Sequence, residues 1–310
     1  MRPERLLQYM IVCILAVLTL TPHSTAQSNP ASAFTPHAGA NDSVAGNRLS
    51  SLYAGSGYGN NLLYLGTTMS QGNSFGYVSA AYGLKEKLYL SATTYTISGL
   101  SPFIAFYSLD LSFSHTFNSW FDINTGFSRY NVAEKLRDTL FGNFSYAYAT
   151  LGFDWRILYT QLSAGLFMAD GTLPYVQARF SRYFETRSFA RDKAFFSIDP
   201  YVNILAGSTF HTESSQGATG TGMNQGTGTG AGIGSGTWKR ERKGRNHPTG
   251  TTITSSFGLI ELDLGLPAAF SYDFFTLELE PGYIIPLYPG KELPRNGGFL
   301  FQVSLFFRIF

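Results

Sequence analysis

The fold is decided by the stretch 301–310, which reads Phe301-Gln302-Val303-Ser304-Leu305-Phe306-Phe307-Arg308-Ile309-Phe310. Its odd positions are all large and apolar, and the even positions 302, 304 and 308 are polar. Successive side chains of a β-strand point to opposite faces, so the stretch predicts a strand with one apolar and one polar face. Such a strand fits a soluble sheet or a membrane barrel, and the rest of the chain has to distinguish them.

The same alternation recurs along the chain, clearly over 109–117, 195–204, 259–264 and 275–280. Over 259–264, for example, Ile260 is expected on the apolar face, opposite Glu261 and Asp263. A transmembrane β-barrel predicts such strands because its outside meets lipid and its lumen is polar. Turn residues divide the chain into about twelve strands. They are expected at 50–68, 74–83, 88–98, 103–117, 121–131, 141–153, 156–168, 173–185, 194–207, 251–264, 271–288 and 298–310.

The amino-terminal region has the layout of a secretory signal peptide. A charged start precedes the apolar run Leu6–Leu20, and Ser24-Thr25-Ala26 offers small residues for cleavage after Ala26. A membrane anchor is the alternative, but the run is short for a span of about 20 residues. The one cysteine, Cys13, lies inside the run, so the mature chain is expected to lack thiols. Residues 27–48 are predicted to be a flexible periplasmic lead-in, and 49–310 the barrel.

Composition supports a barrel. Charged residues make up 14% of the chain and aromatic residues 16%, with 27 Phe and 19 Tyr. No stretch after the signal is apolar for long enough to form a membrane-spanning helix. The formal net charge of +2 argues against a nucleic-acid binder. The fold class expected is therefore an all-β, antiparallel, up-and-down transmembrane barrel.

Connection lengths predict how the barrel is oriented. In outer-membrane barrels, short periplasmic turns alternate with longer outer loops. Tight turns are expected after the second, fourth and sixth strands, and Trp120 and Trp155 fall at such turns, where indole rings favour the membrane interface. The longest connection, about 208–250, is expected to face outward.

The long loop holds two features. Its Gly, Thr and Ser residues over 214–236 lack the strand-then-helix context of a phosphate loop, so no nucleotide site is predicted. A basic run follows, which could bind the phosphates of lipopolysaccharide or acidic glycans, or could simply keep a solvated loop soluble. The basic run consists of Lys239, Arg240, Arg242, Lys243 and Arg245.

The sequence contains no recognisable enzyme signature. The histidines have no metal-ligand spacing, so no metal or other cofactor is predicted. His115 is expected on the apolar face, and the serines near His211 are best explained by chance, so no catalytic residue is assigned.

Charged side chains of the inward face are the more informative candidates. Carboxylates on two adjoining strands are expected to repel one another unless bases or water screen them, and they could form an acidic wall that favours cations or a structural salt-bridge network. The carboxylates are Glu261, Asp263, Glu278 and Glu280, and the candidate basic partners are Arg179, Arg308 and Arg129.

With these features, residues 49–310 resemble the outer-membrane β-barrel proteins of Gram-negative bacteria, porins among them. The resemblance is architectural and has no family-specific motif. It implies location in the outer membrane among lipid and lipopolysaccharide, and assembly by the barrel assembly machinery with Phe310 as the signal. The chain departs in phase, because Ile309 and not Phe310 ends the apolar face.

The expected function is a passive or weakly selective pore for small solutes. The alternative is a non-conducting surface barrel that acts through 208–250, and an outer-membrane enzyme is the third hypothesis.

Overall fold

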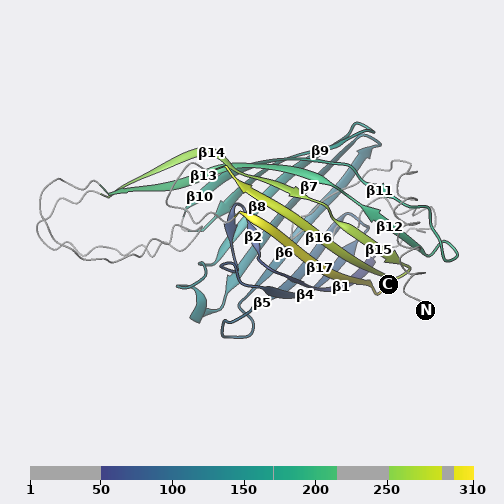
Figure 1. The fold of residues 1–310 in the computed structure, drawn as a ribbon, viewed down its shortest axis with the longest axis horizontal. Helices are drawn as coiled ribbons and strands as arrows, with labels where there is room; N and C mark the ends of the chain where they lie inside the picture. The colour runs from purple at the N-terminus through teal and green to yellow at the C-terminus, as the bar shows by residue number, and fades with distance from the viewer. Residues whose placement is uncertain (1–49, 170, 215–250, 288–296) are drawn as a thin grey trace, which may run out of the picture.

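The computed structural model describes residues 50–169, 171–214, 251–287 and 297–310. The predicted signal peptide and lead-in lie outside these residues. Twelve antiparallel strands form a closed barrel, as the sequence predicts (Figure 1). In ring order the wall consists of β1 (Ser50–Gly59), β4 (Phe75–Leu84), β5 (Leu88–Ile97), β6 (Phe106–Asn118), β7 (Phe121–Val132), β8 (Phe144–Asp154), β9 (Tyr159–Met168), β10 (Thr172–Ser181), β13 (Tyr201–Ser214), β14 (Thr251–Gly265), β16 (Phe275–Pro286) and β17 (Gly298–Arg308).

Pairing between the last and first strands closes the ring. β17 pairs antiparallel with β1, from Tyr53 opposite Arg308 to Gly59 opposite Gln302, and β17 also pairs with β16. The deciding stretch of the sequence is therefore the closing strand of the barrel. Closure removes the free sheet edges, which a membrane-spanning sheet cannot leave unpaired in lipid.

Short breaks interrupt three wall strands. β10 continues as β11 (Phe184–Glu185), β12 (Ala194–Ile198) leads into β13, and β14 continues as β15 (Ala268–Tyr272). Pro200 and Pro267 lie at two breaks, where proline lacks the N–H that a ladder needs. The prediction that a new strand begins at 271 is wrong, because the break at Pro267 resembles a turn in the sequence. β15 belongs to the strand before it, and the reversal comes at Asp273 and Phe274.

The two ends of the barrel differ, as predicted. Most connections at one end, here called the turn end, have two to four residues (85–87, 119–120, 155–158 and 273–274), and 186–193 is the exception with eight. Longer connections lie at the other, the loop end, and include 60–74, 98–105 and 133–143, whereas the β9–β10 connection at this end spans only 169–171. The carboxyl terminus is at the turn end, and the β13–β14 hairpin projects from the loop end (Figure 1). β13 extends to Ser214, beyond the predicted limit of 207.

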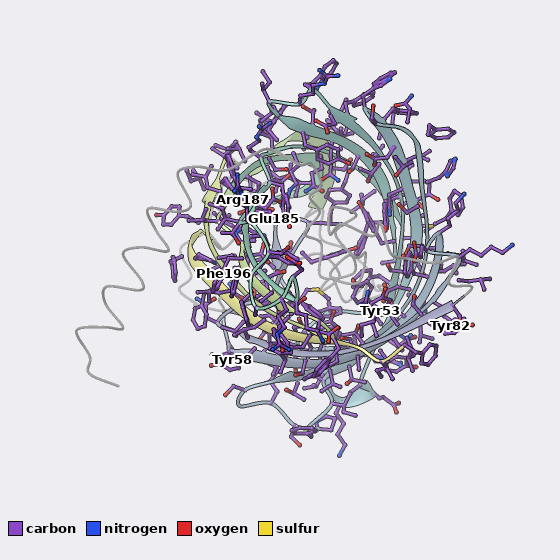
Figure 2. The ribbon with its side chains drawn as sticks, turned by 90° about the vertical axis from the view of Figure 1, so that its right-hand side faces the viewer. Tyr53, Tyr58, Tyr82, Glu185, Arg187 and Phe196 are labelled. Atoms are coloured by element: carbon purple, nitrogen blue, oxygen red, sulfur yellow. The ribbon has the colours of Figure 1, made fainter. Side chains whose placement is uncertain are left out.

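The outside of the wall is apolar. Val78, Leu90 and Leu109 are 63%, 58% and 48% exposed although their neighbours in sequence are buried. In the end-on view, Tyr58, Tyr82 and Phe196 lie outside the ring of strands, whereas Tyr53 lies within it (Figure 2). A soluble protein rarely exposes apolar side chains all round a sheet, so the outer face is suited to lipid.

Aromatic rings mark the turn end. Trp120 and Trp155 are exposed there, as the sequence predicts, and both stack with Phe153. His115 is outward, with its ring 4.6 Å from that of Phe117. Such a girdle is typical of a membrane interface.

On the inside, tyrosine rings cover glycines of neighbouring strands. A Cβ placed on any of these glycines would approach an atom of the tyrosine closer than 3.0 Å. The close approach lets a large ring lie flat against a strongly curved wall, which is a recognised use of glycine in sheets. The pairs are Gly57–Tyr77, Gly83–Tyr89, Gly126–Tyr148, Gly152–Tyr159, Gly165–Tyr146, Gly207–Tyr175 and Gly265–Tyr201.

Candidate functional site

The lumen is the candidate site, and Arg179 is the centre of its charged network. Arg179 projects inward from β10 and is 4% exposed. Its Nη2 lies 3.4 Å from Asp199 Oδ2, and its guanidinium carbon lies 3.7 Å from the centre of the Tyr201 ring. Asp199 and Tyr201 are brought beside it because they flank the break between β12 and β13. A planar cation is thus held between a carboxylate and an aromatic face, which is a favourable arrangement for arginine.

The network continues onto β14 and β16 through the Tyr201 hydroxyl. This hydroxyl lies 3.2 Å from Asp263 Oδ2 and 3.1 Å from Glu280 Oε1. It has one proton, so it can donate to one of the two carboxylates at a time. The structure therefore brings Arg179, Asp263 and Glu280 together through a tyrosine that the sequence did not single out.

Glu278 lies on the same face of β16 and is opposite Ser304 of β17. Ser304 accepts a hydrogen bond of 2.8 Å from the Tyr77 hydroxyl and one of 3.1 Å from Gln302 Nε2. Glu278 also interacts electrostatically with Arg179. These polar and charged side chains form a continuous belt, here called the polar belt, which runs from β10 across the closing strand to β4.

A β-bulge places Glu261 and overturns the prediction for Ile260. The register between β13 and β14 shifts at Leu205 and Ala206, so that one extra residue stands in β14. Alternation alone predicts that Ile260 faces lipid, but both Ile260 and Glu261 are buried inside the barrel. A bulge of this kind breaks the two-residue period and re-aims a side chain.

The opposite side of the lumen holds a separate polar cluster, which the sequence did not single out. Asp110 of β6 accepts a hydrogen bond of 2.9 Å from Ser108, and it also interacts with Ser91 and Ser128 of the flanking strands. A buried carboxylate among serines is stabilised by hydrogen bonds and not by a cation. Alternation alone could have found it, since Asp110 is the charged residue of the polar face of 109–117.

Residues 60–74 form a hairpin inside the lumen, here called the inner hairpin. The sequence predicted a strand over 50–68, but the wall strand ends at Gly59, and β2 (Leu63–Tyr64) and β3 (Thr67–Thr68) form a separate two-stranded sheet. The reversal between them has positive φ at Leu65 (48°) and Gly66 (80°), as a tight hairpin turn requires.

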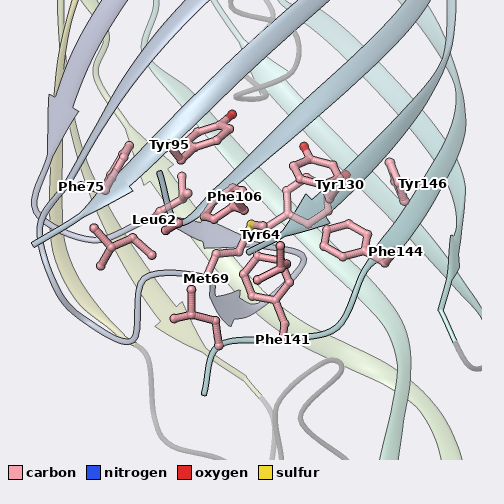
Figure 3. Packing of buried hydrophobic residues seen from close by; sticks show 14 of the residues in the cluster. Leu62, Tyr64, Met69, Phe75, Tyr95, Phe106, Tyr130, Phe141, Phe144 and Tyr146 are labelled. Carbon is pink, nitrogen blue, oxygen red and sulfur yellow. The ribbon is translucent and has the colours of Figure 1, made fainter. Parts of the chain in front are cut away.

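Apolar side chains of the inner hairpin fill the loop-end part of the lumen (Figure 3). Tyr64 lies among Tyr130, Phe144 and Tyr146, with ring centres 5.5 to 5.9 Å apart. The cluster draws on every wall strand from β4 round to β14. Its members are Leu62, Tyr64, Met69, Phe75, Tyr77, Tyr95, Ile97, Ala105, Phe106, Tyr130, Val132, Leu136, Leu140, Phe141, Phe144, Tyr146, Phe167, Tyr175, Leu205 and Ile260.

The remaining predicted residues lie elsewhere. Arg308 is exposed at the turn end, in the inward register of β17 opposite Tyr53. The suggestion that Arg129 faces inward is wrong, because it continues the outward register of β7, is exposed and donates a 3.0 Å hydrogen bond to Ser145. The carbonyl of Phe310 accepts a hydrogen bond from the Leu52 N–H. The basic run 239–245 lies outside the described residues.

Within the described part of the chain, no group of three or more His, Cys, Asp and Glu residues could hold a metal ion. No helix in that part is long and apolar enough to cross a membrane.

Comparison with solved structures confirms the expected resemblance to outer-membrane β-barrels. The KdgM porin is 10% identical over 83% of this chain and 98% of its own, with a TM-score of 0.43. The NanC porin is 9% identical over 83% and 98%, with a TM-score of 0.41. LpxR from Salmonella typhimurium is 7% identical over 82% and 99%, with a TM-score of 0.44. No family profile and no curated protein matches the sequence. Similarity at this level carries no argument about function.

Proposed function

We propose that this protein is an outer-membrane pore for small solutes, with the polar lumen as the conducting path. The observation that carries the proposal is the belt around Arg179, Tyr201 and Glu280 inside a closed barrel whose outside is apolar. Polar and charged side chains are costly inside an apolar core, but they are the usual lining of a water-filled lumen.

The charge of the lining gives the pore a weak preference for cations. Asp199, Asp263, Glu278 and Glu280 gather around Arg179, so carboxylates outnumber the cation they surround. Rings of Asp and Glu favour cations in channels. Arg179 offsets part of this charge, so the two interpretations offered by the sequence, an acidic wall and a salt-bridge network, describe the same belt.

Conductance of the purified protein in a planar bilayer tests the proposal. We expect discrete current steps in potassium chloride and, under a salt gradient, a reversal potential of the sign for cation preference. Glu280→Gln should reduce the reversal potential, because it removes one lumen charge. The pore would be refuted if no current passes through the correctly folded wild-type barrel and none passes through a folded variant whose inner hairpin is deleted.

A non-conducting surface barrel is the second candidate function. Two observations favour it: the inner hairpin occupies the loop-end lumen, and the β13–β14 hairpin projects beyond the loop end (Figure 1). In that case the residues between Ser214 and Thr251, including the basic run, would carry the function. The same bilayer measurement separates the two candidates.

Assembly and location form part of the proposal. An apolar outward face, an aromatic girdle at the turn end and a carboxy-terminal aromatic strand suit insertion by the barrel assembly machinery, with Phe310 in the signal. The turn end then faces the periplasm. Lipid surrounds the wall, and lipopolysaccharide lies around the loop end.

A further inference from the structure

The inner hairpin is attached to the wall in a way that allows it to move as a unit. Its strands β2 and β3 pair with each other in a separate sheet and not with the wall. Further bonds are internal: the Leu62 N–H donates to Ser70 Oγ at 2.9 Å, and the Met69 N–H donates to the Leu62 carbonyl at 2.7 Å. The hairpin therefore keeps these bonds if it leaves the lumen.

The two ends of the inner hairpin differ in how firmly they are held. Asn60 is anchored to the closing strand, because its Nδ2 donates to the Phe299 carbonyl and its Oδ1 accepts from the Phe301 N–H, both at 3.0 Å. The other end passes through Gln71 and Gly72, which are exposed and have φ of 55° and 77°, and its bond to the rest of the barrel there is from the Gln71 side chain to the Thr139 carbonyl of a loop-end connection. No atom lies within 4 Å of where a Gly72 Cβ would be. A fixed root and an uncrowded turn together form a hinge.

The tip of the hairpin contacts the wall at the bulge of β14, in addition to the packing of Tyr64 and Leu65 in the cluster. A Cβ on Gly66 would lie 2.3 Å from Ile260 Cγ2 and 3.7 Å from Ile260 Cβ. The Gly66 N–H also hydrogen-bonds with the Glu261 carboxylate. The bulge thus holds the tip by an apolar contact and a charge-assisted hydrogen bond.

From this arrangement we propose that the inner hairpin is a gate, which seals the loop end of the lumen at rest and swings about Asn60 and Gly72 to open it. The inference rests on the proposed pore function. Packing of Leu62, Tyr64 and Met69 in the cluster holds the closed state, and the tip contact at Glu261 acts as the latch. A closed state that dominates leaves the open conformer populated at about 0.1–10%.

A disulfide between hairpin and wall tests the gate directly. The distance of 3.7 Å between the Cβ positions of residues 66 and 260 matches the mean of about 3.8 Å in disulfides. Ile260→Cys also removes the Cγ2 atom that a Cβ at 66 would meet. Cys13 lies in the predicted signal peptide, so Gly66→Cys/Ile260→Cys would carry the two thiols of the mature chain.

We expect the oxidised double variant to show no opening events in a bilayer, and reduction to restore them to the level of Ile260→Cys alone. Replacing residues 61–73 with a short Gly-Ser linker should raise the open fraction at least about tenfold, given a minor open state. Heat-modifiable gel mobility verifies that each variant is a folded barrel.

The possible outcomes separate failure of the gate from failure of the pore. Equal current through the oxidised and reduced forms, with both conducting, would overturn the gate and leave the pore intact. Conductance of the wild type equal to that of the linker variant would overturn it too. Absence of current in every folded form, the linker variant included, would refute the pore itself. Should the disulfide variant fail to fold, labelling of Met69→Cys by an impermeant maleimide supplies the test, and a rate unchanged by the membrane voltages that open the pore would overturn the gate.

Discussion

Replacing Arg179 with methionine is the perturbation for which the structure predicts a large loss of stability. Arg179 Nη2 and Asp199 Oδ2 are 3.4 Å apart, and their side chains are 5% and 7% exposed. At that separation two unit charges attract by about 5 kcal/mol at an effective dielectric constant of about 20. Desolvation offsets much of this attraction, but removal of one partner leaves the other charge buried and uncompensated, which costs about 3–5 kcal/mol. We expect Arg179→Met to lower the free energy of unfolding by that amount.

Urea unfolding of the barrel in lipid vesicles measures the effect. Since unfolding free energy falls by about 1–3 kcal/mol per molar urea, the midpoint should drop by at least about 1 M. Arg179→Met/Asp199→Asn should recover part of the loss, because the buried carboxylate is then neutralised too. An Arg179→Met midpoint equal to that of the wild type would show that water screens the pair and that the lumen network is not closely packed.

The control for this prediction is an exposed ion pair of the same chain. Lys193 Nζ lies 3.0 Å from Asp273 Oδ2 at the turn end, outside the strands. A hydrogen bond and the charge of Asp273 raise the pKa of Lys193. Both side chains are about half exposed, so solvent screens the pair despite the shorter distance. Lys193→Met should leave the urea midpoint unchanged.

Three further predictions test the wall and the cluster. Gly57→Ala should destabilise the barrel by about 1–3 kcal/mol, because the new methyl group would meet the Tyr77 ring and the Val303 carbonyl oxygen. Gly258→Ala is the control: no atom lies within 4 Å of its Cβ position, so this variant should leave heat-modifiable mobility unchanged. Tyr64→Ala should cost about 3–5 kcal/mol in urea unfolding, because it empties the centre of the cluster, and a loss no larger than that of an outward tyrosine variant would count against the packing in Figure 3. Leu109→Arg, on the outer face, should cost about 2–4 kcal/mol in vesicles if lipid covers that face, and an unchanged midpoint would contradict the membrane assignment.

The wall could be predicted from sequence because one physical rule governs it. Alternation between lipid and lumen acts on every strand, and short turns mark the ends, so both the strand number and the alternation of connections follow. The rule also placed Glu278 and Glu280 on the inward face. It failed where proline interrupts a strand, at Pro267, because a break in the ladder and a reversal of the chain have similar sequences.

The partners inside the lumen could not be predicted in the same way. Alternation gives the face of a residue but not its height in the barrel, which depends on the register between strands. The alternation over 195–204 puts Tyr201 on the polar face, yet only the pairing of β13 with β14 brings its hydroxyl to Asp263. For Arg129 the predicted face itself was wrong. The odd positions of 121–127 face outward, and Arg129 continues that register although it is charged.

The inner hairpin escaped prediction because its sequence is compatible with continuing the wall. Residues 62–65 are apolar or aromatic in any conformation, and a run that leaves the wall after Gly59 has the same composition as one that stays in it. The reversal at Leu65 and Gly66 is a hairpin signal, but it lies inside a segment long enough for one membrane strand. Length is the signal that could have helped, since a 19-residue strand is well beyond the 9–11 residues that usually span a membrane.

The bulge in β14 connects the two halves of the lumen. Without its extra residue, Ile260 would face lipid and the apolar cluster would end at Leu205. With it, an apolar side chain and Glu261 project inward side by side, so the boundary between the apolar and polar parts of the lumen falls between two consecutive residues. The neighbouring strand provides the space, because a Cβ on Gly207 would meet Ile260 Cδ1 at 3.0 Å, and the hairpin tip comes closer still, because a Cβ on Gly66 would lie 2.3 Å from Ile260 Cγ2. Two glycines and one inserted residue therefore fix where the hairpin docks. The bulge thus positions both Ile260, against which the hairpin tip packs, and Glu261, which acts as the latch. This role is consistent with the tendency of bulges to lie beside functional sites.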